Sequence, residues 1–284
     1  MPRIALATSS QYPGLTGDDR LLLEPLRTRS FQAVPAIWSE PRDWSLYDAV
    51  IIRSCWDYHL QPEKFLTWID GLERARIPIF NSGQMVRWNA DKIYLRDLEA
   101  KGIAIVPTSW PESTNPISLA NRLRELAWSK AVVKPRISAT AYRTQLVTAD
   151  NAASAQPLFE DLLGGHGVML QKFMDPIREG EWSLMFFGGK FSHAVLKKPK
   201  PGDFRVQNDF GGTAELADPP PHVLSSAVGA VEATAPSLYA RVDGVVDKDT
   251  FRLMELELIE PALFLADQPQ AAASFADAIA AAMG

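Results

Sequence analysis

Three acidic residues lie in or just after an apolar segment near the carboxyl end of the chain. Residues 251–263 read FRLMELELIEPAL, with Glu255 and Glu257 between leucines and Glu260 three positions further on. Side chains alternate along a strand, so Glu255 and Glu257 project from one face, roughly 7 Å apart, and the leucines pack on the other. An unpaired carboxylate is costly to bury. This strand therefore either faces solvent or binds cations.

A second charged pair precedes that strand. Arg241 and Asp243 are also two residues apart, and the DKDT that separates the two segments favours a hairpin turn. In one register Asp243 lies opposite Glu255 and Arg241 opposite Glu257, whereas a shift by one residue places the pairs on opposite faces. The turn does not choose between these registers. In the first, carboxylates without histidine or cysteine converge, a ligand set that suits magnesium, with manganese as the alternative.

Two lysines and a loop of small residues could bind phosphate. Lys134 ends the apolar AVVK and precedes RISATAYRT, in which Ser138 and Thr140 would offer hydroxyl and backbone N–H groups. Lys92 lies in NADKIYLRDLEAKG, which predicts a helix with Asn89 as its N-cap. Taken singly, each lysine is equally well explained as a solvated side chain.

The apolar strand in VMLQKFM could bind an adenine at its end. Backbone groups and apolar side chains would both be available there, from Gln171, Lys172, Phe173 and Met174. Glu181, a few residues later, could reach ribose hydroxyls. The alternative is an ordinary exit from a strand into a loop.

The elements that must position these residues begin with an alternating pattern. In about the first 85 residues the apolar segments RIALAT, FQAVPAIW, YDAVIIRS and IPIFN alternate with helical spacing, which predicts a parallel sheet with helices on its faces. Ligands bind at the carboxyl ends of such strands, which points to the loop RSCWDYH. We expect Arg53 and Ser54 to bind a substrate carboxylate, Trp56 to form a wall and Asp57 to bind an amino group. Alternatively, the aromatic residues are core and Asp57 caps the next helix.

Composition excludes several classes of protein. The 284 residues are 46% hydrophobic and 22% charged, with a net charge of −5, which is typical of a globular protein. The acidic balance argues against binding to nucleic acid or to an anionic membrane. A single cysteine, Cys55, and no apolar run of about 20 residues lead us to expect a cytoplasmic protein. Aromatic and alanine-rich surface would permit a homodimer.

Taken in order along the chain, these features resemble the ATP-grasp superfamily, which includes D-alanine ligases and glutathione synthetases. The resemblance covers nearly the whole chain and implies an α/β fold, α+β in the nucleotide half. It implies a Rossmann-like substrate domain with a parallel sheet (1–88), a linking helix and strand (89–104), and a two-lobed ATP-binding module. The two lobes would be a central lid (105–172) and a catalytic subdomain (173–284).

The resemblance also implies roles for individual residues. RVD matches the Arg-x-Asp of the family and ELE its Glu-x-Asn, so Asp243, Glu255 and Glu257 would bind two magnesium ions and Arg241 a phosphate. ATP would bind through Lys92, Lys134, the small-residue loop, the 171–174 strand end and Glu181. Two features depart from the family pattern: Glu257 replaces an asparagine, and the phosphate loop contains no glycine, so we expect it to be stiff.

Enzymes of this superfamily phosphorylate a carboxylate with ATP, and a nitrogen then attacks the acyl phosphate. Arg205 or Lys198, in or before the polar loop KPGDFRVQNDFGG, would add positive charge for the transfer. The segments IIRSCWDYH and LMELELIEPALFL further resemble a subgroup that includes a cyclo-ligase forming D-cycloserine from O-ureido-D-serine. An amino-acid-like substrate and intramolecular cyclisation are therefore our expectation. An intermolecular carboxylate–amine ligase, a small-molecule kinase and a non-catalytic nucleotide binder remain alternatives.

Overall fold

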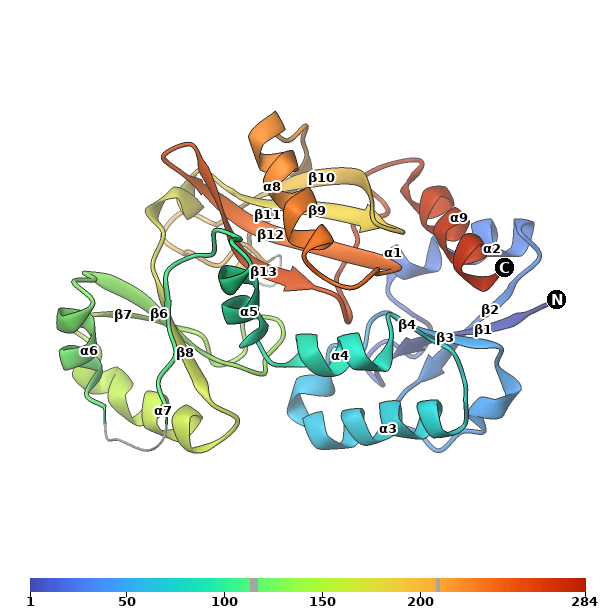
Figure 1. Ribbon diagram of the computed structural model, residues 1–284, viewed down its shortest axis with the longest axis horizontal. Helices are drawn as coiled ribbons and strands as arrows, with labels where there is room; N and C mark the ends of the chain where they lie inside the picture. Colours follow the sequence, from blue (N-terminus) through green and yellow to red (C-terminus); the bar gives the residue numbers. More distant parts are fainter. Residues whose placement is uncertain (113–116, 208–209) are drawn as a thin grey trace.

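Three β-sheets follow one another along the chain in the computed structural model, which describes residues 1–112, 117–207 and 210–284 (Figure 1). The first sheet is parallel, in the order β2-β1-β3-β4, as the alternating pattern predicts. Its strands are β1 (Arg3–Thr8), β2 (Gln32–Ile37), β3 (Ala49–Ile52) and β4 (Ile79–Phe80). The intervening helices are α1 (Gly17–Arg20), α2 (Leu23–Thr28) and α3 (Pro62–Arg74), with short 3₁₀ helices at Trp44–Leu46 and Tyr58–Leu60.

The linking segment contains two helices where the sequence predicted one. Helix α4 spans Gly83–Ala90 and α5 spans Tyr94–Ala100. Asn89 is not an N-cap: it lies buried inside α4, where its amide Nδ2 donates to the carbonyl of Leu256 and its Oδ1 accepts from the N–H of Leu258, both at 2.8 Å. The helix breaks at Asp91, whose carboxylate caps Ile93 and pairs with Arg136. Contacts with distant strands thus override the local helical pattern.

The second sheet forms a separate lobe with two helices against it (Figure 1). Its order is β5-β8-β6-β7, and all its pairings are antiparallel. The strands are β5 (Thr108–Ser109), β6 (Lys130–Pro135), β7 (Gln145–Thr148) and β8 (Val168–Lys172). The helices are α6 (Leu119–Glu125) and α7 (Ala152–Gly164).

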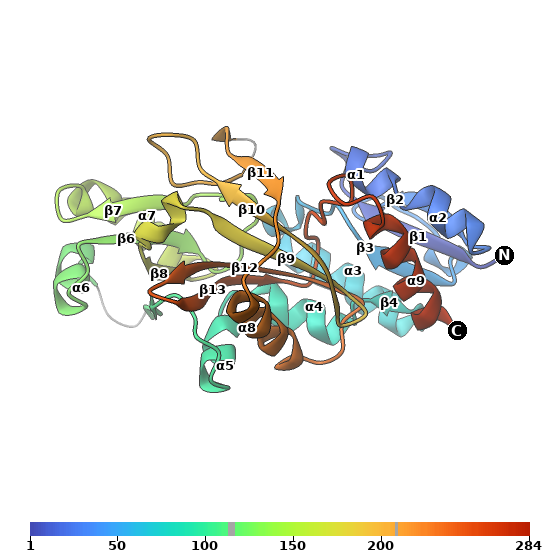
Figure 2. The same cartoon turned by 90° about the horizontal axis from the view of Figure 1, so that it is seen from above.

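The third sheet lies between the other two when the molecule is seen from above (Figure 2). Its order is β11-β10-β9-β12-β13, again antiparallel. The strands are β9 (Glu181–Phe187), β10 (Lys190–Lys198), β11 (Thr213–Leu216), β12 (Tyr239–Asp247) and β13 (Thr250–Glu257), preceded by a 3₁₀ turn at Asp175–Arg178. Helix α8 (Pro221–Glu232) packs on β12 and β13, while α9 (Ala271–Met283) packs against α2, β9 and β10. No described helix is long and apolar enough to cross a membrane.

The β12–β13 hairpin adopts the first of the two registers considered. Arg241 pairs with Glu257 and Asp243 with Glu255, so the four charged side chains share a face. A bulge follows Asp243 and shifts the pairing toward the turn. A Cβ on the next residue, Gly244, would lie 2.5 Å from the carbonyl oxygen of Arg252. Glycine is therefore required where the register changes.

Candidate active site

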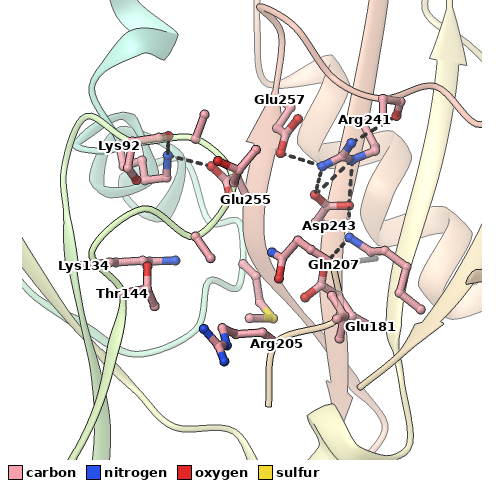
Figure 3. A pocket seen from close by; sticks show the side chains of 18 of the residues that line it. Lys92, Lys134, Thr144, Glu181, Arg205, Gln207, Arg241, Asp243, Glu255 and Glu257 are labelled. Atoms are coloured by element: carbon pink, nitrogen blue, oxygen red, sulfur yellow. Dashed lines mark hydrogen bonds and ion pairs between the residues drawn. The ribbon is translucent and has the colours of Figure 1, made fainter. Parts of the chain in front are cut away.

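A cavity of about 390 Å³ opens among the third sheet, the second sheet and the loop that follows β3 (Figure 3). Fifteen of the nineteen residues singled out from the sequence line it. They are Trp56, Lys92, Lys134, Ser138, Thr140, Gln171, Lys172, Phe173, Met174, Glu181, Arg205, Arg241, Asp243, Glu255 and Glu257. Residues more than 200 positions apart in the sequence thus share one cavity wall.

Opposite charges are paired along this wall (Figure 3). Lys92 Nζ lies 2.8 Å from Glu255 Oε1, and Arg241 Nη2 lies 2.5 Å from Glu257 Oε1 and 2.9 Å from Asp243 Oδ2. Asp243 also accepts a hydrogen bond from Ser183. Because an isolated charge is costly away from water, these pairs explain how the strand tolerates its carboxylates.

Two carboxyl groups of the hairpin, those of Asp243 and Glu257, differ in pKa. Burial would raise the pKa of Asp243, but the charges of Arg241 and Lys197 lower it to about 2. Burial raises the pKa of Glu257 to about 7, assisted by the charges of Glu255 and Asp243 and opposed by Arg241. At neutral pH the Glu257 carboxyl is therefore protonated in part of the molecules, and in that form it is uncharged like the asparagine that the family pattern has there.

The carboxylates fit magnesium that is held partly by phosphate. No three His, Cys, Asp or Glu residues of the described chain form a ready-made metal site. Glu255 and Glu257 each bind a cation through Oε1, and among the described residues their Oε2 atoms have no hydrogen-bond partner. Magnesium in nucleotide sites typically takes one or two carboxylates together with phosphate oxygens. These two oxygen atoms, with Asp243 beside them, suit such a site.

Positive charge and small side chains meet where phosphates were expected. Lys134 has no ion-pair partner among the described residues, and burial lowers its pKa. Lys92 Nζ also donates to the carbonyl of Ser138 at 2.7 Å, which connects the glycine-free loop to the segment between α4 and α5. Thr140 and Ala141 have φ angles of 51° and 55°, so this loop adopts left-handed backbone without glycine. The free ammonium group of Lys134 can bind a phosphate.

The predicted adenine end is apolar and rigid. The backbone N–H groups of Lys172 and Phe173 donate to Pro107 and Lys130 within the protein. Met174 is buried beside the half-buried ring of Phe173. Glu181 is buried and pairs with Lys197, whose Nζ lies 2.5 Å from its Oε1. An apolar surface that can contact a base thus lies next to a paired carboxylate that can reach a ribose.

Four predicted site residues do not line the cavity. Arg53 is buried in an ion pair with Asp19 (2.9 Å), and the hydroxyl of Ser54 pairs with that of Thr8 (2.9 Å). Asp57 accepts a hydrogen bond from the indole of Trp38 (2.7 Å) and makes no helix-capping bond. Lys198 is exposed, because the side chains of β10 alternate and its neighbour Lys197 faces inward. Arg53, Ser54 and Asp57 are thus engaged by other side chains, and Lys198 faces solvent.

Lys197 is the main residue that the sequence reasoning missed. It lines the cavity, lies 2.5 Å from Glu181 and 3.5 Å from Asp243, and is buried. Side chains alternate along β10, so Lys197 shares a face with His193 and Val195, which are both buried. This alternation was the feature of the sequence that could have identified Lys197. Other lining residues not anticipated are Tyr12, Asn89, Tyr94, Thr144 and Gln207.

Comparison with known proteins agrees with this geometry. Residues 4–81 match the family model of the D-cycloserine synthetase DcsG amino-terminal domain. The cycloserine biosynthesis protein DcsG of Streptomyces lavendulae is 30% identical over 292 residues, which cover 98% of this chain and 97% of that protein. The chain belongs to the DcsG family.

Solved structures extend the likeness to the whole fold. The crystal structure of D-cycloserine synthetase DcsG superposes with a TM-score of 0.89 at 27% identity, covering 99% of this chain and 100% of that one. D-alanine–D-alanine ligase from Bacillus anthracis, solved in complex with ATP, gives a TM-score of 0.72 at 17% identity over 100% of this chain and 97% of that one. This DcsG-family chain has the ATP-grasp fold and is an ATP-dependent ligase, as the order of its motifs implied.

Proposed function

We propose that this chain is a cyclo-ligase that uses ATP to close O-ureido-D-serine into D-cycloserine. The observation that carries the proposal is the match of residues 4–81 to the amino-terminal domain of D-cycloserine synthetase. This domain contributes Tyr12, Trp56 and Tyr58 to the cavity, and substrate specificity is expected at such loops. The 30% identity to DcsG over 98% of the chain supports the same substrate.

In the proposed reaction the substrate carboxylate attacks the γ-phosphorus of ATP, giving an acyl phosphate and ADP. The nitrogen bonded to the side-chain oxygen attacks the acyl carbon, phosphate leaves and the ring closes. Since the product lacks the carbamoyl group, that group must leave by hydrolysis as carbon dioxide and ammonia. Acyl phosphates react with water, so the site must exclude it.

The residues of this chain would stabilise charge during both steps. Lys134 and Lys92 lie where the phosphates are expected, and Arg241 is placed to neutralise oxygen charge at the acyl centre. Asp243, Glu255 and Glu257 would hold magnesium, which would offset the charge of the β- and γ-phosphates. Arg205 pairs with Asp203 in this structure (2.7 Å) and would join the phosphates by exchanging that partner.

The test is an ATP-consumption assay with magnesium across small amino-acid-like carboxylates, with and without an added amine. ADP release with O-ureido-D-serine alone, together with D-cycloserine identified by mass spectrometry, is the expected result. Strict dependence on an added amine would instead identify an intermolecular ligase. A stable phosphorylated product would identify a kinase.

A further inference from the structure

Among the described residues, Glu260 is the carboxylate of the cavity that has no cationic partner. Five described acidic side chains line the cavity, and four of them, Glu181, Asp243, Glu255 and Glu257, bind lysine or arginine. Within the described part of the chain, the Glu260 side chain forms no hydrogen bond or ion pair. The cations nearest to it are already engaged: Lys92 with Glu255, and Arg241 with Asp243 and Glu257. A cation that pairs with Glu260 would therefore come from outside the described chain.

Hydrogen bonds from two other segments of the chain fix the backbone around Glu260. Trp56 Nε1 donates to the carbonyl oxygen of Glu260 at 2.9 Å. Arg53 Nη2 donates to that of Pro261 at 2.7 Å, and Arg241 Nη1 to that of Ala262 at 3.0 Å. Three successive carbonyls are thus fixed by the first sheet and the hairpin. The half-buried Glu260 carboxylate is therefore fixed at the wall of the cavity.

Aromatic side chains surround this end of the cavity. Tyr12 and Trp56 both line it, with ring centroids 5.1 Å apart in an edge-to-face arrangement, and Tyr58 lies nearby. Aromatic faces attract cations, most strongly where water is excluded. Burial raises the pKa of the Glu260 carboxyl well above its usual range, with the charge of Glu257 adding to the effect. An incoming cation would offset this unfavourable burial.

We propose that Glu260, with Tyr12 and Trp56, binds the ammonium group of the substrate. This inference rests on the proposed function, because it names how an amino-acid-like carboxylate is recognised. It moves the amine-binding role from Asp57, which accepts a hydrogen bond from the indole of Trp38, to Glu260. An ammonium group paired with Glu260 keeps its proton and has no free lone pair, so it cannot attack the acyl phosphate. The nitrogen bonded to the side-chain oxygen is then the nucleophile.

The test compares Glu260→Gln with the wild-type enzyme on O-ureido-D-serine and on its analogue without the α-amino group. Charge-assisted hydrogen bonds contribute about 1.5–3 kcal/mol. We therefore expect KM for the amino substrate to rise about 10- to 100-fold in Glu260→Gln, with the KM for the desamino analogue unchanged. Glu260→Asp, which keeps the charge, should raise KM less.

Asp57→Asn is the matched control, expected to leave both KM values within about twofold, since asparagine can still accept from Trp38. Stabilisation of each variant by ADP and magnesium in thermal unfolding reports an intact nucleotide site. An active wild type with an unchanged KM in Glu260→Gln overturns the ammonium site alone. A wild type that consumes no ATP with any α-amino carboxylate overturns the proposed function and the ammonium site together.

Discussion

Pairing of charges decides which polar side chains of the cavity can meet a ligand. Asp243 is surrounded by Arg241, Lys197 and Ser183, whereas Lys134 and Glu260 have no partner among the described residues. Lys134 is a base and Glu260 an acid, so the two can bind different groups of a ligand. The paired groups form a fixed electrostatic framework, and the unpartnered ones remain available for phosphate and for substrate.

Lys197 and Lys198 are adjacent residues on opposite faces of β10 and should differ sharply in importance. Lys197→Met leaves the buried Glu181 without its cation and removes one of the two cations beside Asp243. Breaking a buried ion pair costs about 3–5 kcal/mol, and we expect ATP consumption to fall at least about 100-fold. Lys198→Met should stay within about twofold, because that side chain is exposed. Urea unfolding and steady-state rates measure both effects. Equal losses of rate and stability in the two variants would refute the assignment of Lys197, and not Lys198, to the site.

Glu257 should tolerate the asparagine of the family pattern but not alanine. Glu257→Asn keeps an oxygen ligand, so we expect a rate within about tenfold, whereas Glu257→Ala should lose about 100-fold or more. Because the pKa of Glu257 is raised to about 7, its metal-binding form is lost as pH falls below that value. The wild-type kcat/KM for ATP should therefore rise with pH through about 7, and Glu257→Asn should lack this rise. Identical pH profiles would contradict a metal-binding role.

At the scale of helices and strands, the site depends on how the strands pair. Their register brings charged side chains to the face that lines the cavity. The bulge after Asp243 allows Arg241 and Asp243 to face Glu257 and Glu255 while the hairpin still closes at its turn. β10 brings Lys197 opposite Glu181 on β9. The segment after β13 is fixed through its carbonyl groups, among them those of Leu263 and Phe264, which contact His193.

Gly244→Ala should damage the hairpin, because the new Cβ would lie 2.5 Å from both the carbonyl of Arg252 and the ring of Phe251. We expect a loss of about 2 kcal/mol or more in the free energy of unfolding, with weaker ATP binding. Gly229→Ala is the control: it lies within α8 with no atom within 4 Å of its Cβ, and helix propensity predicts a gain of about 0.5–1 kcal/mol. Chemical denaturation of both variants is the measurement. A neutral Gly244→Ala would show that the bulge needs no glycine.

His193 should make the fold sensitive to mild acid. Its Nε2 lies 3.0 Å from the carbonyl of Leu263, and burial lowers its pKa. The unfolded chain therefore takes up a proton before the folded one, so stability is lost as pH falls below the unfolded value of about 6.5. Between pH 7 and 5 the free energy of unfolding should fall more in the wild type than in His193→Gln, by at most about 1.4 kcal/mol per pH unit. If the free energy of unfolding falls equally with pH in the two proteins, His193 is not the source of the acid sensitivity.

For the whole molecule, the second sheet is joined to the rest by polar contacts beside the cavity and by apolar side chains, among them Met169 and Ile137. Arg136 pairs with Asp91, and its carbonyl accepts from the N–H of Lys92. The ring of Tyr142 lies 5.0 Å from that of His59, which belongs to the loop after β3. A lobe attached in this way can close over a nucleotide, and its contact with the loop after β3 would transmit that movement to the substrate side of the cavity.

ATP with magnesium should therefore order the loop between β6 and β7. We expect amide hydrogen exchange across residues 136–144 to slow by about tenfold or more on binding, while α8, which packs on the far face of the third sheet, stays unchanged. Hydrogen-exchange mass spectrometry with and without ATP is the measurement. Uniform protection of both segments would indicate global stabilisation in place of lid closure.

The sequence alone determined the order of the motifs, the parallel sheet of the first domain and the face of β13 that carries Glu255 and Glu257. These follow from local periodicity, because alternation in a strand fixes which side chains share a face. It limited the hairpin to two registers but did not choose between them.

Only the tertiary structure decided which of several polar candidates reaches the cavity. Arg53 and Asp57 are engaged by Asp19 and Trp38, Lys197 faces inward in place of Lys198, and Glu260 has no side-chain partner among the described residues. The physical reason is that a charged side chain is committed by whichever opposite charge or donor packs against it. Those partners lie 16 to 34 residues away along the chain, beyond the reach of any local pattern.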